Sequence, residues 1–182
     1  MFVDITHEKK EKYTITKSGE YIFYFENKNG KLVFDLLCPD ATVAVYGLYR
    51  GYGNENFTLS ITQNHHAPES ESTVLIKSIL DKKSVLKLTG TIHIAKNARK
   101  TTAHFTNRNL ILNKKAHVIT QPQLEVIPGD VTCTHAATTA PPDKDCIAYL
   151  ANRGINEKRA KDLLIKGFAD EILNIKSRFR VT

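Results

Sequence analysis

The stretch RNLILNKKAHVITQPQLEVIPGDVTCTHAATT, residues 108–139, carries the pattern around which the rest of the chain is organised. It contains an extended run at 117–127 and ends in the triplet Cys133-Thr-His135. Successive side chains of a β-strand point to opposite faces, so Cys133 and His135 are expected to project from the same face. A thiolate and an imidazole side by side can bind a soft metal ion.

Short β-rich runs of the same kind recur through the upstream sequence. Turn residues such as Asn29-Gly30 and Pro39-Asp40 separate them, and no helical pattern lies among them. These runs predict an all-β body. They span residues 21–25, 32–37, 43–49, 57–62, 73–80, 85–94, 101–105, 110–112 and 117–127.

Four turn pairs bear on how these strands are arranged, because each places a polar residue before a small one and an extended stretch follows. Closely spaced turn-then-strand units are typical of a solenoid, in which each coil stacks its apolar side chains on the next. A β-sandwich would show more two-residue hairpin turns, and only Asn29-Gly30 gives that signal. This pattern alone leaves both architectures open. The pairs are Asp40-Ala41, Lys83-Ser84, Asn97-Ala98 and Lys115-Ala116.

The composition changes near both ends of the chain. Residues 1–19 are polar and charged, and we expect a loose arm or an edge strand there. The β-rich core then covers 20–139. At 140–182 the chain becomes helical in character, because Pro141 and Pro142 cannot donate to a strand ladder. We therefore expect a small C-terminal helical domain.

An antiparallel helical hairpin is predicted within this last segment. Asp143 is a suitable N-cap, Gly154 a suitable left-handed residue after the first helix, and Asn156 a suitable cap for a longer second helix. Apolar residues at spacings of three and four then form one face of that helix, namely Ala160, Leu163, Leu164, Gly167, Phe168, Ile172 and Ile175. Part of this hairpin is expected to bind a partner, through some of Tyr149, Leu150, Leu164 and Phe168.

The charge and the terminal sequence limit the class of protein. The chain has 26 Lys and Arg against 19 Asp and Glu, a net charge of +7, but the basic residues are scattered. A nucleic-acid binder usually gathers them on one face, so we expect no nucleic-acid partner. The first residues include acids where a signal peptide would have none, and no apolar run approaches bilayer length. We expect a cytoplasmic protein without a membrane partner.

Cysteines and histidines outside the triplet give weaker signals. Three cysteines without CxxC spacing argue against a disulfide framework and a structural zinc site. Cys38 and Cys146 are expected to be packed. His65 and His66 face opposite ways if they lie in a strand, and both could bind one ion only from a loop. As single histidines in separate strands, His93, His104 and His117 are expected to be structural.

Motifs for hydrolysis are missing from the sequence. It has no Gly-rich phosphate loop, no nucleophile elbow and no HExxH. We therefore expect a chain that binds no nucleotide and is not an enzyme. A sugar-cleaving β-helix enzyme would need several carboxylates along one face, and these strands offer few.

Five segments resemble, in order and spacing, the C-terminal half of the SufB/SufD family of iron–sulfur cluster assembly proteins. They are 108–112, 120–126, 130–139, 149–155 and 167–173. A weaker likeness reaches back to 65–67 and 77–80, while residues 1–57 match little. Members of this family are usually longer, so the chain resembles a shortened form. The resemblance implies a right-handed parallel β-helix with a small C-terminal α-helical hairpin.

The resemblance also implies which branch of the family is meant. In the SufB-like branch, a cysteine before the Leu-Ile-Leu strand and a glutamate directly after the motif histidine are associated with cluster assembly. This chain has Asn107 and Ala136 there, which supply neither a thiolate nor a carboxylate. The SufD-like branch uses the histidine of the Cys-x-His motif, present as His135 beside Cys133. These two residues are the implied ligands of a transient iron–sulfur cluster at a subunit interface.

Two functions of different classes follow. The first is a SufD-like, non-catalytic scaffold of a SUF-type complex, which pairs with a SufB-like chain or with itself and docks a SufC-like ABC ATPase. The alternative is a homodimeric β-solenoid binding module that has kept the fold and lost cluster assembly.

Overall fold

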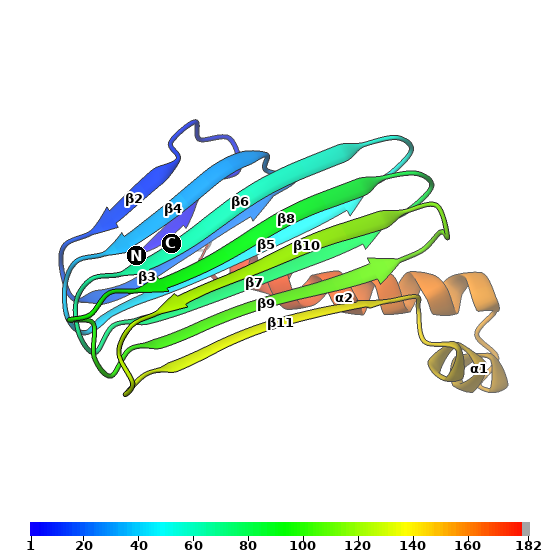
Figure 1. Ribbon diagram of the computed structural model, residues 1–182. Coiled ribbons are helices and arrows are strands. Elements are labelled where there is room, and N and C mark those ends of the chain that lie inside the picture. The colour runs from blue at the N-terminus through cyan, green and yellow to red at the C-terminus, as the bar shows by residue number, and fades with distance from the viewer. Residues whose placement is uncertain (180–182) are drawn as a thin grey trace.

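The structure, a computed structural model, describes residues 1–179. The chain winds as a parallel β-helix whose successive strands alternate between two facing sheets (Figure 1). One sheet has six strands in the order β1 (Phe2–Asp4), β3 (Gly19–Glu26), β5 (Ala41–Gly51), β7 (Glu71–Leu80), β9 (Thr102–Ile111) and β11 (Thr132–Ala140). The other has five, in the order β10 (His117–Val126), β8 (Val85–Ile94), β6 (Asn56–His65), β4 (Gly30–Leu36) and β2 (Lys12–Ile15).

Parallel pairing decides between the two architectures that the sequence left open. Each strand pairs with the strand one coil before or after it, and all pairings among the described residues are parallel. A β-sandwich would show antiparallel pairings between its strands. The expected solenoid is confirmed.

The four turn pairs identified in the sequence lie at the corners of the coils. Their small residues, Ala41, Ser84, Ala98 and Ala116, are at most 6% exposed. A larger side chain would not fit between stacked turns, so a small residue recurs where the chain bends back into the core.

Strand β9 differs from the expectation of two short runs at 101–105 and 110–112. It is continuous, although it contains the buried polar residues Asn107 and Asn109. The Asn109 side-chain amide donates to the Thr138 carbonyl oxygen at 3.0 Å, and the Asn107 amide donates to Thr120 Oγ1 at 3.0 Å. These hydrogen bonds compensate the burial of the polar groups, so a polar sequence can continue a core strand.

The first nineteen residues add two short edge strands, β1 and β2, one to each sheet. Between them the chain folds over the first coil, where Ile5 is fully buried. The buried Lys28 ammonium donates to the carbonyl oxygens of Ile5 at 2.9 Å and Glu8 at 2.6 Å. This end of the solenoid is therefore closed by the protein's own chain.

The opposite end of the solenoid is open. Strands β10 and β11 each pair with one neighbour only, β8 and β9 respectively. Large apolar side chains are exposed there, with Leu124 at 53% and Ile127 at 57%. Both sheets thus end in a long strand that no other part of the described chain covers.

Two helices, α1 (Lys144–Asn152) and α2 (Glu157–Phe179), follow β11. The expected caps are confirmed. Asp143 accepts from the backbone amides of Asp145 and Cys146, Gly154 has φ +84°, and Asn156 Oδ1 accepts from the Arg159 amide at 2.9 Å. Neither helix is long and apolar enough to cross a membrane, and these are the only helices in the described range.

Helix α2 lies along the outer face of the six-stranded sheet (Figure 1). Its sheet-facing stripe differs partly from the expected one. Leu163 is 37% exposed, whereas Ala169, which was not expected there, is buried, together with Ala160 and Ile172. Only a narrow stripe of a helix can contact a flat sheet. In α2 this stripe also includes the half-buried residues Ile165, Phe168 and Leu173.

Charged side chains hold α2 in this position. The Lys77 ammonium, on β7, donates to the Phe168 carbonyl oxygen at 2.8 Å and forms an ion pair with Glu171. Arg108, on β9, also pairs with Glu171, at 3.4 Å. Because Lys77 is only 3% exposed, its charge would be costly to bury without these partners.

Candidate functional site

Cys133 and His135 lie on the last strand, β11, two residues apart. Both are half-buried and face the interior of the final coil, as the alternation of the strand predicts. The imidazole of His135 stacks on the Phe105 ring, with the centroids 4.5 Å apart and the planes at 22°. At the open end of the solenoid, Cys133 and His135 therefore lie next to an apolar surface that includes the Phe105 ring.

The ring of His135 makes no hydrogen bond to any described residue. Both ring nitrogens are buried, yet neither has a hydrogen-bond partner within residues 1–179. Burial also lowers the pKa of His135, because the charged imidazolium loses its hydration. At neutral pH the imidazole is therefore neutral, and one nitrogen carries a lone pair that can bind a metal ion.

Gly90, on the facing strand β8, makes room for this histidine. A Cβ atom at position 90 would lie 2.8 Å from His135 Cε1 and 2.6 Å from Phe105 Cζ, closer than real contacts allow. Our sequence analysis did not identify Gly90. A glycine inside a strand often marks the close approach of another group, and that signal was available.

Asn107 lies on β9, where it faces Ala137 of β11 in register. The side chain is fully buried, and its Oδ1 has no hydrogen-bond partner in the described chain. By the resemblance, this position corresponds to the assembly cysteine of the SufB-like branch. The neighbouring Ala136 is exposed, on the opposite side of β11 from His135. Neither position offers a charged or thiolate ligand.

The thiol of Cys133 is a weaker ligand candidate than His135. Burial raises its pKa above the ordinary value, because desolvation disfavours the thiolate. A metal ion must therefore displace a proton before it can bind there. Within residues 1–179, no three His, Cys, Asp or Glu side chains are placed to hold a metal ion together. A cluster bound at His135 would need ligands from outside this set.

The four hairpin residues expected to bind a partner are all at least partly exposed. On α1, Tyr149 is 58% exposed, with the Arg153 guanidinium 4.9 Å from its ring centroid, and Leu150 is half-buried. On α2, Leu164 and Phe168 are half-buried. Phe168 also contacts the Lys77 ammonium, 4.3 Å from its ring centroid, so it holds α2 on the sheet as well.

A groove of about 800 Å³ separates the helical hairpin from the end of the solenoid. Its apolar lining includes Ile147 of α1, Ile165 of α2 and Leu112, which follows β9. Helix α1 has no buried residue at all. The hairpin therefore offers an accessible surface close to the open end.

The remaining histidines form no site with His135. His65 points into the core, where Ser70 Oγ and Ser72 Oγ each lie 2.7 Å from a ring nitrogen, and His66 is exposed on the other side. This confirms that the adjacent pair faces opposite ways. Of the single histidines, His117 is exposed, His104 Nδ1 lies 2.6 Å from Thr134 Oγ1, and His93 lies 4.0 Å from Glu125.

The two remaining cysteines also lie apart from His135. Cys38 is half-buried, whereas Cys146 is exposed, so the expectation that Cys146 is packed was wrong. Helix α1 touches the body too little to cover it. The hydrogen bond to the Asp143 carboxylate raises the pKa of the Cys146 thiol, which makes it less reactive.

Comparison with known proteins gives a family match and several relatives. The family described as SUF system FeS cluster assembly, SufBD core domain, matches residues 23–168. The iron–sulfur cluster assembly protein SufD of Escherichia coli is 35% identical over 133 residues, which cover 73% of this chain and 31% of that protein. The SufBD family protein slr0076 of Synechocystis is 36% identical over 63% of this chain and 25% of its own length.

A third relative, the SufD protein of Bacillus subtilis, is 33% identical over 74% of this chain and 30% of its own length. The chain thus spans about a third or less of each of these relatives. The family match covers both sheets except β1, β2 and the start of β3, and it includes the open end and most of the helical hairpin. The chain therefore belongs to the SufBD core family of SUF-system iron–sulfur cluster assembly proteins.

Proposed function

We propose that this chain is a SufD-like, non-catalytic scaffold subunit of a cytoplasmic SUF-type complex. In this proposal the open end of the solenoid pairs with a SufB-like chain or with a second copy. The helical hairpin docks a SufC-like ABC ATPase. His135 supplies one ligand to an iron–sulfur cluster that is assembled at the subunit interface and then handed on.

The single observation that carries the proposal is the position of His135. Its two ring nitrogens are buried without hydrogen-bond partners in the described chain, and the residue lies on β11, one of the two uncovered edge strands. An unpaired buried polar group costs about 1–3 kcal/mol, which a ligand or a partner can recover. The long edges of β10 and β11 offer unpaired backbone groups that favour the addition of another chain's strands.

A cluster at this interface suits a neutral imidazole. Iron in clusters is held chiefly by thiolates, and histidine in their place raises the reduction potential. A site that must release its cargo benefits from such a ligand. The raised pKa of Cys133 argues that its thiol contributes less, although iron can displace the proton.

The test replaces His135 with alanine in the complex reconstituted with a SufB-like chain and an ATPase. We expect the melting temperature and subunit association to stay close to wild type, because the imidazole makes no hydrogen bond to the described chain. Cluster formation, followed by visible absorbance, should fall sharply. Cys133→Ser should show a smaller loss.

His104→Ala is the matched control. This histidine lies on the neighbouring strand β9, is half-buried, and has the Thr134 hydroxyl within hydrogen-bonding distance. It should leave cluster formation unchanged. If His135→Ala lowers stability yet the complex still assembles clusters normally, the ligand role is wrong and the histidine is structural.

The alternative, a homodimeric binding module that no longer assembles clusters, is favoured by Asn107 and Ala136, which stand where the SufB-like branch carries its cysteine and glutamate. Co-purification separates the two functions. Reproducible capture of an ABC-type ATPase supports the scaffold. A stable homodimer that ignores such an ATPase supports the module.

A further inference from the structure

A group of lysines lies in the turns that lead from the six-stranded sheet to the five-stranded sheet. The turns after β5, β7 and β9 stack on one another, because the strands that follow them are neighbours about 4.8 Å apart. We call their basic residues the lysine corner, which consists of Lys82, Lys83, Lys114 and Lys115. All four side chains are exposed.

The four ammonium groups of the lysine corner form no ion pair with a described residue. Within residues 1–179, no carboxylate oxygen lies within 4.0 Å of any of these four ammonium groups. The turns on the other side of the solenoid differ. There Lys100 pairs with Glu69 and Arg99 with Asp130, each at 3.0 Å. In this second row of turns Lys17 and Lys96, which also pair with no described carboxylate, lie on turns that are not adjacent, so within residues 1–179 only the lysine corner gathers four unpaired lysines on neighbouring turns.

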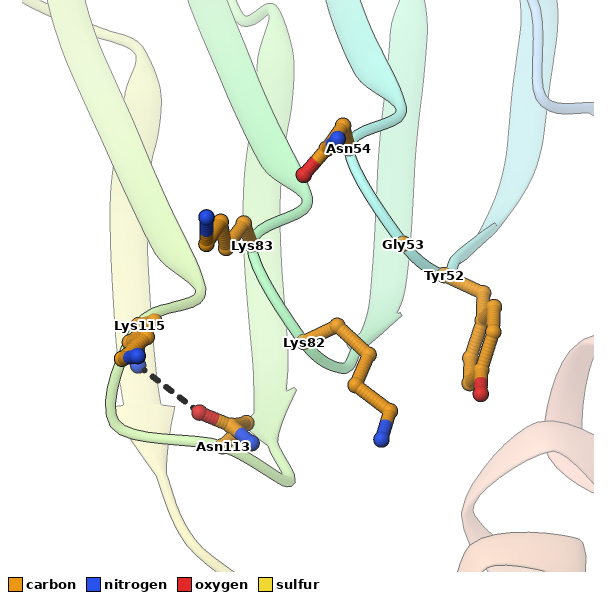
Figure 2. A pocket seen from close by; sticks show the side chains of 7 residues that line it. All are labelled: Tyr52, Gly53, Asn54, Lys82, Lys83, Asn113 and Lys115. Atoms are coloured by element: carbon orange, nitrogen blue, oxygen red, sulfur yellow. Dashed lines mark hydrogen bonds between the residues drawn. The ribbon is translucent and has the colours of Figure 1, made fainter.

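The lysine corner also has a hollow. A pocket of about 400 Å³ lies between the three turns. Figure 2 shows the residues that line it, namely Tyr52, Gly53, Asn54, Lys82, Lys83, Asn113 and Lys115. Tyr52 is 63% exposed, and the Lys82 ammonium lies 5.7 Å from its ring centroid. The amide groups of Asn54 and Asn113 add neutral hydrogen-bonding groups to the lining. Such a hollow has room for a few side chains.

We propose that the lysine corner binds an acidic segment of a protein partner. Carboxylates would pair with the lysine ammonium groups, and Tyr52 would pack against the aliphatic part of the bound segment. The proposal goes beyond the function assigned above and does not depend on His135. It also revises the sequence-based expectation that the basic residues are merely scattered, because folding gathers these four.

A nucleic acid fits the lysine corner less well. The three turns contain no arginine, the residue whose planar fork best matches phosphate groups. Tyr52 is the one aromatic residue among them, whereas single-stranded nucleic acids usually bind along several stacking side chains. The same turns also contain the carboxyl groups of Glu55 and Asp81, which accept hydrogen bonds from the backbone amides of Tyr52 and Lys82 and do not discriminate between the two kinds of anion.

The experiment uses a triple variant in which Lys83, Lys114 and Lys115 become glutamine. Lys82 is kept, because its φ of +58° makes that position sensitive to substitution. A fluorescent poly-glutamate peptide and a single-stranded oligonucleotide of equal charge are titrated by anisotropy at low and at physiological salt. We expect the variant to weaken peptide binding by roughly tenfold, a loss that shrinks as salt screens the charges.

The control variant replaces Lys17, Lys31 and Lys96 with glutamine. These lysines are also exposed, and no carboxylate of the described chain pairs with them. Each variant removes three charges from a net +7, leaving +4. The control should keep wild-type peptide affinity within roughly a factor of two. Equal losses in both variants would reduce the effect to net charge and overturn the proposal, as would tighter binding of the oligonucleotide than of the peptide.

Discussion

The two ends of the solenoid are built differently. At the N-terminal end the strands shorten to three and four residues, and the segment between them folds over the first coil. At the C-terminal end β10 and β11 keep ten and nine residues, and no described segment covers them. Short, covered edges prevent further pairing, whereas long, open edges invite it. The N-terminal end of the solenoid thus has short, covered edge strands, whereas the C-terminal end has two long strands that no described residue covers.

The aromatic packing follows the same division. Tyr13, Phe23 and Phe34 pack against one another beneath the closed end, with ring centroids 4.9 to 5.3 Å apart. At the open end the equivalent interior positions of β10 are partly or fully exposed. We therefore expect the stability of the isolated chain to depend on the closed end, while the open end contributes chiefly to assembly.

The largest expected effect tests this division directly. Phe23→Ala should lower the free energy of unfolding by about 3–5 kcal/mol, because it removes a side chain that is 1% exposed and leaves a cavity in the aromatic cluster. Urea denaturation measures the change. Leu124→Ala, at the open end, should change it by no more than about 0.5 kcal/mol, since Leu124 is already 53% exposed. Equal losses at both ends would refute the comparison.

The second expected effect concerns His65 in the middle of the solenoid. Burial lowers its pKa to about 4, below the ordinary value of 6.5, so the folded state favours the neutral ring. Stability is therefore fully present above pH 6.5 and decreases as the pH falls toward 4, where the unfolded chain binds the proton first. The shift corresponds to a loss of up to about 3 kcal/mol, measurable by denaturation at several pH values.

His65→Gln is the matching variant, because an amide can replace part of the hydrogen bonding to Ser70 and Ser72 without titrating. It should lower stability at neutral pH and flatten the pH profile between 6.5 and 4. A profile as steep as that of the wild type would assign the acid sensitivity to other groups.

The smallest expected effect concerns the cover of the closed end. Lys28→Met removes the two hydrogen bonds to the carbonyl oxygens of Ile5 and Glu8 and should cost about 2 kcal/mol. Hydrogen exchange should show the loss first in residues 5–11. The control, Lys31→Met, changes an exposed lysine nearby and should leave exchange unaltered. Equal exchange in both variants would show that Lys28 does not hold the cover.

Local features of the fold were predictable from the sequence. The caps at Asp143, Gly154 and Asn156 depend on side-chain and backbone preferences within a few residues. The common face of Cys133 and His135 follows from strand alternation alone. Solenoid and sandwich could not be distinguished in this way, because both produce strands with the same period of two. The resemblance to the SufB/SufD family favoured the solenoid over the sandwich.

Features that depend on distant contacts could not be read from the sequence. Gly90 and His135 are 45 positions apart, and only the coiling of the chain brings them together. The continuity of β9 through Asn107 depends on a hydrogen bond to Thr120, on another strand. The sheet-facing stripe of α2 is accompanied by ion pairs of Lys77 with Glu171 and of Lys176 with Asp4 and Glu26, which hydrophobic periodicity does not reveal.

Glu171 joins the helical hairpin to two strands of the six-stranded sheet. Its carboxylate is tied to Lys77 on β7 and to Arg108 on β9, two residues that face each other in register. Nearer the C-terminal end of the same helix, α2, the Lys176 ammonium pairs with Asp4 on β1 and Glu26 on β3, each at 3.2 Å. Arg108 directly follows Asn107, whose side chain lies inside the last coil. Helix α2 is therefore fastened both to strands near the open end and to strands at the closed end, so it spans the outer face of the sheet between them.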